Sequence, residues 1–157
     1  LTEEEYRAFR EDGYFLMKDA LPPNLVQRYL EITREVVEEY KRVHNVPMDR
    51  YFGVIDFIGQ RDELLNLVDW YRTLPKIWGI LGPDIKLYHT VGMQTPPTTK
   101  YKLEEHREWV NWHTDTGNLT RDIQESIEPP RISMKVGYVL ETGFCPSVIP
   151  ASTRSKT

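Results

Sequence analysis

The heptapeptide IKLYHTV, residues 85–91, marks the point at which the sequence changes from helical to extended patterns. Apolar and polar side chains alternate along it, as they do in a half-buried β-strand. The segments before it favour helices, and most segments after it favour strands. Helices first and strands later indicate an α+β domain rather than a βαβ alternation. The sequence also has no glycine-rich phosphate-binding loop, which argues against a dinucleotide-binding fold.

The segment before residue 20 predicts a short helix and a short strand. Thr2 and Glu5 have the spacing of a capping box, and Gly13 is a stop signal, so a helix is expected over about 2–12. Residues 14–17, YFLM, are aromatic and aliphatic and predict a short buried strand.

A longer amphipathic helix is expected from Pro22-Pro23 to about His44-Asn45. Apolar residues spaced by three or four positions share one face, namely Leu25, Tyr29, Ile32, Val36, Tyr40 and Val43. Charged residues are expected mostly on the opposite face, namely Glu31, Glu38, Glu39, Lys41 and Arg42.

The remaining elements are shorter. An extended segment is predicted at 51–57, and helices are predicted at 61–70 and 74–81, the last one closed by Gly82-Pro83. Beyond residue 91, the strand candidates are 109–113, 132–140 and 144–149.

The composition limits the class of protein. The chain has 157 residues, 39% of them hydrophobic and 28% charged, which suits one globular domain. A net charge of -4 without a concentrated basic face argues against a nucleic-acid partner. No apolar run reaches the length of a membrane span. Cys145 is the only cysteine, which excludes an internal disulfide and a thiolate zinc cage and favours a reducing, cytoplasmic setting.

The segment VNWHTDTG, residues 110–117, is the strongest candidate for chemistry. Residues i and i+2 of a strand point to the same side, so His113 and Asp115 can direct a nitrogen and a carboxylate oxygen at one point. These are donors of the two-histidine, one-carboxylate triad that binds Fe(II) and leaves open positions. A hydrogen-bonded His–Asp pair at a strand end is the simpler interpretation of the triplet alone.

Several segments, in order, resemble the phytanoyl-CoA dioxygenase family of Fe(II)/2-oxoglutarate oxygenases, over nearly the whole chain. The opening LTEEEYRAFREDGYFLMKDALPP is similar to the family's entry helix, strand and following proline. Further similar segments are Asp56-Phe57, Thr73–Pro75, Gly82–Ile85, the strand HTVGMQTPP, the motif Trp112-His113-Thr114-Asp115, Lys135–Leu140 and Val148–Ser152.

The resemblance implies a double-stranded β-helix, the jelly-roll barrel of the cupins, buttressed by N-terminal helices. We expect a single domain over 1–157, with a mainly helical buttress at 1–84 and the first part of the barrel at 85–157. The resemblance also implies that His113 and Asp115 bind iron. It implies that Val91, Gln94 and Thr114 line the 2-oxoglutarate pocket, although Thr114 stands where the family often has Gln.

The implied activity is that of a dioxygenase that uses Fe(II), 2-oxoglutarate and O2 to hydroxylate a small organic or acyl substrate, with release of succinate and CO2. The carboxylate of Asp115 argues against the halogenating relatives, which lack it. A cupin-type zinc hydrolase would need more nitrogen ligands than this segment offers. The sequence identifies neither the substrate nor the oligomeric state.

One part of the family pattern is missing. The family has a second iron-binding histidine and a 2-oxoglutarate-binding arginine downstream, but no histidine follows Asp115 and Arg154 comes too early to match. The chain also starts at Leu1 rather than Met. We expect either a piece of a longer enzyme whose barrel is incomplete here, or a truncated or degenerate relative that serves as a non-catalytic binding module.

The sequence contains three other histidines. His89 is expected to be a hydrogen-bonded histidine of the core or rim, or else to point into the barrel. His44 is placed favourably at a helix C-terminus and is expected to be structural. His106 lies in a charged segment and is expected on the surface.

Overall fold

The fold is that of a computed structural model, in which residues 1–94, 133–142 and 148–151 are described. Contacts divide the chain into two compact units, Leu1–Pro96 with Tyr138–Thr157, and Pro97–Gly137. Only residues 133–137 of the second unit are described. The helices and strands below all belong to the first unit, and the expectation of a single domain over 1–157 stays a prediction.

The first helix confirms the prediction from its capping signals. α1 spans Glu3–Asp12. The Thr2 hydroxyl accepts a hydrogen bond from the Glu5 backbone N–H at 3.2 Å, and the Glu5 carboxylate accepts one from the Thr2 N–H at 2.8 Å. Gly13 ends the helix with a φ of 86°, a left-handed conformation that favours glycine. The strand predicted at 14–17 is wrong: these residues form no strand, and Leu16 is 83% exposed.

The long amphipathic helix is also confirmed. α2 spans Pro23–Val43, with proline at its first position, and it buries an apolar stripe that includes Tyr29, Ile32 and Val36. The prediction that Lys41 lies on the polar face is wrong, because its side chain is fully buried. Lys41 follows Val37 by four positions, and residues four apart share a face of a helix.

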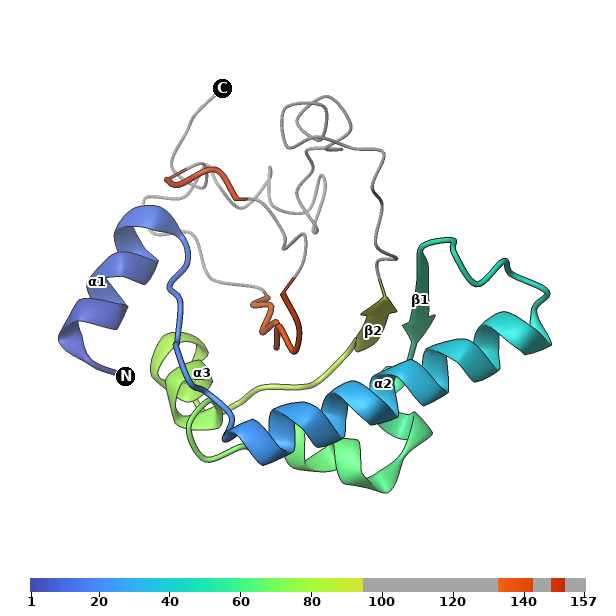
Figure 1. Ribbon diagram of the computed structural model, residues 1–157. Helices are drawn as coiled ribbons and strands as arrows, with labels where there is room; N and C mark the ends of the chain where they lie inside the picture. Colours follow the sequence, from blue (N-terminus) through green and yellow to red (C-terminus); the bar gives the residue numbers. More distant parts are fainter. Residues whose placement is uncertain (95–132, 143–147, 152–157) are drawn as a thin grey trace. The chain divides into compact units, whose positions relative to one another are not determined.

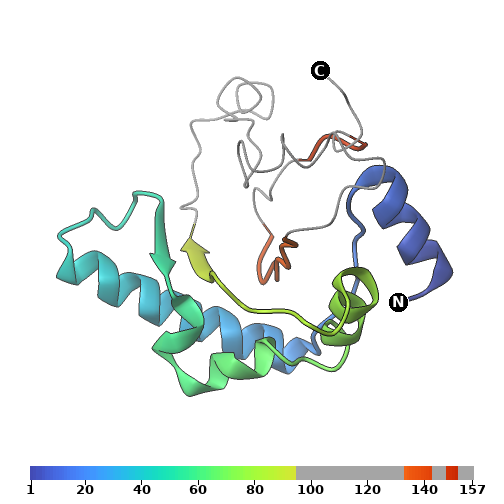
Figure 2. The ribbon, with the colours of Figure 1, turned by 180° about the vertical axis from the view of Figure 1, so that it is seen from behind.

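A two-stranded antiparallel sheet packs against α2. β1 spans Phe52–Ile55 and β2 spans Val91–Gln94, in a register that pairs Phe52 with Gln94 and Ile55 with Val91. Both strands contact α2, and Figures 1 and 2 show them side by side over its C-terminal half. The predicted extended segment at 51–57 is therefore confirmed over its central residues.

The chain between the strands is mostly helical. Two 3₁₀ helices, η1 (Phe57–Gln60) and η2 (Asp62–Leu67), precede α3 (Leu74–Leu81), which ends at Gly82. α3 has the predicted bounds, whereas the segment predicted helical at 61–70 forms the shorter η2. The core that η1 and η2 share with α2 and β1 consists of Leu21, Tyr29, Ile32, Val36, Val37, Val54, Phe57 and Leu64, and α3 contributes no residue to it.

Other strand predictions differ from the structure. The strand expected at 85–91 begins only at Val91 and continues to Gln94. The described residues 133–140 and 148–149 form no strand, so these predictions are wrong there. The candidate at 109–113 lies outside the described residues. With a two-stranded sheet in the described part, the double-stranded β-helix stays a prediction.

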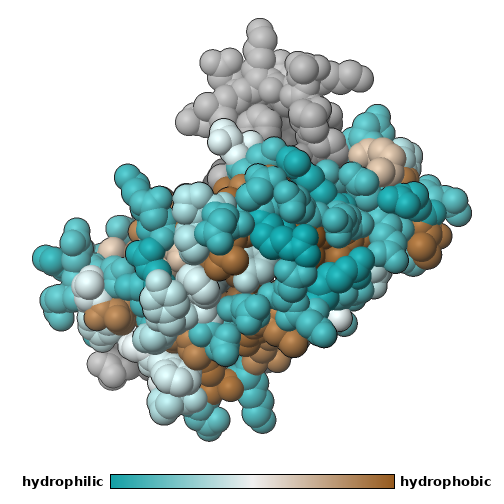
Figure 3. Space-filling model, turned by 60° about the horizontal axis from the view of Figure 1, so that its bottom comes forward, coloured by the Kyte–Doolittle hydropathy of each residue, from teal (hydrophilic) through white to brown (hydrophobic). Residues whose placement is uncertain are grey.

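Charged residues cover the outer side of the helices. Arg28 of α2 binds Glu63 of η2 through two hydrogen bonds, at 2.8 and 2.5 Å, and Arg61 binds Glu39 at 2.9 Å. On the face drawn in Figure 3, hydrophobic residues form separate groups between hydrophilic ones. No helix in the described ranges is both long and apolar enough to span a membrane.

Candidate functional site

The predicted iron ligands lie outside the part of the chain that the structure describes. His113, Thr114 and Asp115 all fall within 95–132, as does His106. Their roles therefore stay predictions. Of the five residues predicted to hold metal or cosubstrate, Val91 and Gln94 are described, both on β2.

Val91 and Gln94 lie on opposite faces of the sheet. They are three positions apart on one strand, and successive strand residues alternate between faces. Val91 pairs with Ile55 on a face that carries no helix among the described elements, where the two side chains are 38% and 62% exposed. Gln94 pairs with Phe52 on the face that packs against α2. The strand therefore does not bring these two side chains together.

Gln94 accepts a hydrogen bond from Lys41, a buried residue that the helical pattern predicts on the polar face of α2. The Lys41 ammonium group donates to the Met48 carbonyl at 2.9 Å and to the Gln94 side-chain oxygen at 3.5 Å. The Lys41 side chain has no exposed surface, and no described carboxylate pairs with it. A buried cation depends on such oxygen contacts, since it has lost its hydration. Lys41 thus ties α2 to β2 and to the loop before β1.

The opposite face of the sheet is apolar and open in the described structure. Met93 and Ile55 on this face are 55% and 62% exposed, and the hydroxyl of Tyr51, which is 56% exposed, donates to the Met93 sulfur at 3.1 Å. Val91 belongs to this face. Of the two described cosubstrate-pocket candidates, Val91 is the more exposed, at 38%, whereas Gln94 is partly buried.

The absence of a side chain at Gly92 allows β2 to pack closely against Phe57 of η1. A Cβ atom at Gly92 would overlap the ring of Phe57, a core residue that is 7% exposed. A larger residue at 92 would therefore displace Phe57 or separate η1 from β2. The glycine positions Val91 and Gln94 by keeping β2 close to η1.

The two described histidines have separate surroundings. His89 is exposed, and its ring stacks beside that of Tyr88 with centroids 6.4 Å apart. His89, which is predicted in the core or at the rim, is therefore exposed in the structure. His44 follows the last residue of α2, and its backbone N–H donates to the Tyr40 carbonyl at 3.0 Å, which agrees with a structural role at the helix end.

The shifted pKa values belong to contacts between elements. Burial opposes ionisation of Glu5, but hydrogen bonds from Lys76 of α3 and from the Thr2 backbone leave its pKa lowered. Burial raises the pKa of Tyr138, although the hydrogen bond with the Thr73 hydroxyl, at 2.8 Å, opposes this change. Perturbed groups often mark functional sites, but each of these has a structural partner that explains its shift.

The described residues hold no group of three or more His, Cys, Asp or Glu side chains that could bind a metal ion. Comparison with protein-family models, with curated proteins and with solved structures gave no match. The candidate site therefore consists of the predicted pair His113 and Asp115, with Val91 and Gln94 placed on opposite faces of β2.

Proposed function

We propose that this chain carries the iron-binding part of an Fe(II)/2-oxoglutarate-dependent dioxygenase, similar to the phytanoyl-CoA dioxygenase family. Its reaction is the hydroxylation of a small organic or acyl substrate, with release of succinate and CO2. The observation that carries the proposal is the motif Trp112-His113-Thr114-Asp115, in its order relative to the other segments that resemble the family.

The donor chemistry of the motif fits ferrous iron. An imidazole nitrogen and a carboxylate oxygen are two of the three protein ligands in the facial triad of non-haem Fe(II) oxygenases. Iron in such a site supplies the activation of dioxygen that couples 2-oxoglutarate decarboxylation to substrate oxidation. His113 and Asp115 would hold the metal, and a further histidine would be needed to complete the triad.

The described residues support the proposal through the environment of β2. The open apolar face that includes Ile55, Val91 and Met93 offers an organic substrate a surface without charged side chains. Lys41 and Gly92 keep β2 against α2 and η1. A firmly held strand can orient the side chains on it that bind substrate.

The second candidate is a non-catalytic binding module of the same family. Such a module requires no second histidine ligand, and residues 116–157 contain no histidine. An intact His–Asp pair favours the enzyme, because a module without iron has no need of that pair. The two candidates differ in whether the chain forms succinate.

Anaerobic titration with Fe(II) and 2-oxoglutarate tests the proposal. We expect a metal-to-ligand charge-transfer absorption band that saturates with 2-oxoglutarate, followed by succinate formation when O2 is admitted. Asp115→Ala should abolish both signals, because it removes one ligand from the metal. Asp84→Ala is the matched control, since Asp84 is exposed and its side chain makes no ion pair with the described residues.

Each outcome separates the candidates. A saturable band without succinate indicates a binding module that keeps the metal. A band and turnover that survive Asp115→Ala would refute the ligand assignment. His113→Ala and the exposed His89→Ala form a second pair, of which only His113→Ala should lose iron.

A further inference from the structure

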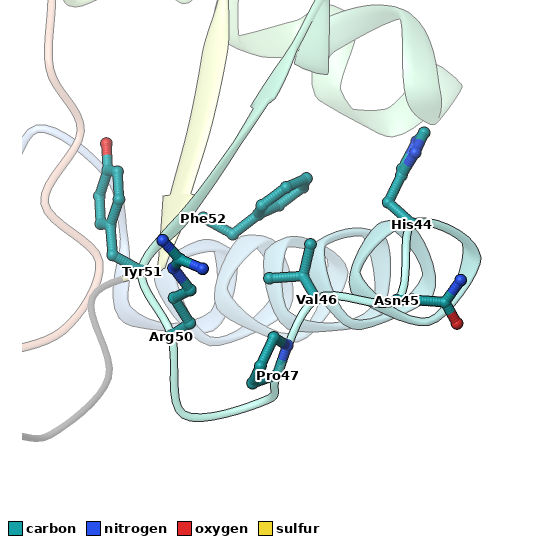
Figure 4. Close-up of a pocket in the computed structure, with 7 residues that line it drawn as sticks. All are labelled: His44, Asn45, Val46, Pro47, Arg50, Tyr51 and Phe52. Carbon is teal, nitrogen blue, oxygen red and sulfur yellow. The ribbon is translucent and has the colours of Figure 1, made fainter.

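An open pocket lies where the loop after α2 turns back into β1 (Figure 4). Its volume is about 400 Å³, within the range of roughly 300–1,000 Å³ that is usual for small-ligand pockets. The residues that line it are His44, Asn45, Val46, Pro47, Arg50, Tyr51 and Phe52. None of these described residues is acidic, and two carry basic side chains.

The apolar part of the pocket is formed by three neighbouring side chains. Figure 4 shows the Phe52 ring above Val46, with Pro47 below Val46. Phe52 is half-buried and packs against the core, so its ring has a supported position. A flat or branched hydrocarbon group of a ligand can contact such a surface and lose its water.

Arg50 supplies the charge. Figure 4 shows its guanidinium group turned toward β1 rather than away from the loop. Within the described ranges Arg50 forms no ion pair, whereas two carboxylates in the C-terminal half of α2 do: Glu38 pairs with Arg42 at 3.9 Å and Glu39 with Arg61 at 2.9 Å. A guanidinium group binds a carboxylate or phosphate through two parallel hydrogen bonds.

The loop that forms the pocket is fixed by its backbone. The Val46 N–H donates to the Lys41 carbonyl at 2.8 Å, and the Arg50 N–H donates to the Pro47 carbonyl at 3.1 Å. The buried Lys41 ammonium donates a hydrogen bond to the Met48 carbonyl at 2.9 Å. These three contacts preform the pocket, so a ligand need not order the loop when it binds.

We propose that this pocket binds a small organic oxyanion, with a carboxylate or phosphate monoester group on Arg50 and an apolar body on Val46 and Phe52. His44 and Asn45 line the other end of the pocket, and Figure 4 shows their side chains directed away from Arg50. Lys41 acts as a positioning residue, because it holds the loop without lining the pocket. The lining of the pocket includes none of the predicted iron ligands, and the proposal does not depend on the proposed dioxygenase activity.

Titration of the full chain with phenyl phosphate and with phenylacetate, followed by ¹H–¹⁵N NMR, tests the proposal. We expect saturable shifts of the amide signals of residues 44–52 with at least one of the two probes, which also tells phosphate from carboxylate. Benzyl alcohol, which lacks the charge, and inorganic phosphate, which lacks the apolar body, should each bind more weakly by about tenfold or more.

Variants assign the binding to Arg50. Arg50→Gln should raise the Kd of the bound probe by about tenfold or more, and Arg50→Lys should raise it less, because a charge without the bidentate geometry remains. Arg42→Gln is the matched control. Arg42 lies near the C-terminal end of α2, its side chain is 71% exposed, and it does not line the pocket. It should leave the Kd within about twofold, as expected for a screened charge outside the site.

Two results would overturn the assignment. One is the absence of saturable shifts at residues 44–52 with either probe at millimolar concentration. The other is an equal loss of affinity in Arg42→Gln and Arg50→Gln, which would mean attraction by general charge. Because Arg50 is exposed, the spectra of these variants should keep the dispersion of the folded protein, which checks that the loss is local.

Discussion

The two faces of the β1–β2 sheet share the same eight backbone positions but have opposite surroundings. On the face toward α2, Val54 is 1% exposed and Gly92 is buried. On the other face, Ile55 and Met93 are 62% and 55% exposed, although both are apolar. The covered face follows from helix packing within residues 1–94, whereas no described element packs on the open one. Stability should therefore depend on the first face, and ligand access on the second.

The sharpest test of this difference is a pair of glycine substitutions. Gly92→Ala should lower the free energy of unfolding by about 2–3 kcal/mol, because the added methyl group overlaps the Phe57 ring in a packed region. Gly53→Ala should change it by less than about 1 kcal/mol, since its Cβ would lie 3.3 Å from Val91 Cγ1 on the open face, where that side chain can give way.

Urea unfolding of both glycine variants gives the measurement. Equal destabilisation by the two substitutions would mean that the open face is packed as tightly as the covered one.

A second pair compares neighbouring aliphatic side chains. Val54→Ala should cost about 2 kcal/mol, from lost burial and an incompletely filled cavity beside α2. Ile55→Ala removes more atoms, yet it should cost less than about 0.5 kcal/mol, because most of that side chain already contacts water. Thermal unfolding in parallel with wild type would rank them, and a larger loss for Ile55→Ala would contradict the assigned faces.

An acid titration separates the sheet from the contact between α1 and α3. Glu5 has a lowered pKa in the folded protein, so its ionised form stabilises the fold above the unfolded-state pKa near 4.5, and this contribution disappears as pH falls through the lower folded-state value. Both side chains of the Glu5–Lys76 pair are about one-fifth exposed, at 21% and 18%. We expect a loss of less than about 1 kcal/mol.

Glu5→Gln should remove this acid-dependent loss without changing the difference between Val54→Ala and Ile55→Ala. If that difference followed the same titration, the sheet and the α1–α3 contact would be energetically coupled.

Local signals predicted the helices well. The capping box of Thr2 and Glu5, the paired prolines at the start of α2 and the glycine after α3 act within a few residues, and the structure follows each of them. Strands were predicted less well, because a strand needs a partner that its own sequence does not specify. Residues 14–17 have strand-like composition but pair with no strand in the described part of the chain, and β2 starts where Val91 pairs with Ile55.

The residues of the candidate site also differ in how far the sequence alone predicts them. The spacing of His113 and Asp115 predicts two ligands from the sequence alone, and that prediction is open to the iron titration. The opposite orientation of Val91 and Gln94 follows from alternation once β2 is known to contain both residues. The sequence analysis does not predict the burial of Lys41, because a charged residue is expected on the surface. Its position one turn after the buried Val37 is the signal that indicates burial.

The complete burial of Lys41 makes its amine an internal reporter of opening. Acylating reagents attack neutral, accessible amines, so Lys41 can react only when α2 separates from the loop at Met48. Mass-spectrometric labelling kinetics at this one residue would therefore measure how often that part of the core opens, against the reaction of lysines on the surface. An oxyanion bound at residues 44–52 should slow this reaction. The labelling rate of Lys41 would then report ligand binding at the loop without knowledge of the protein's substrate.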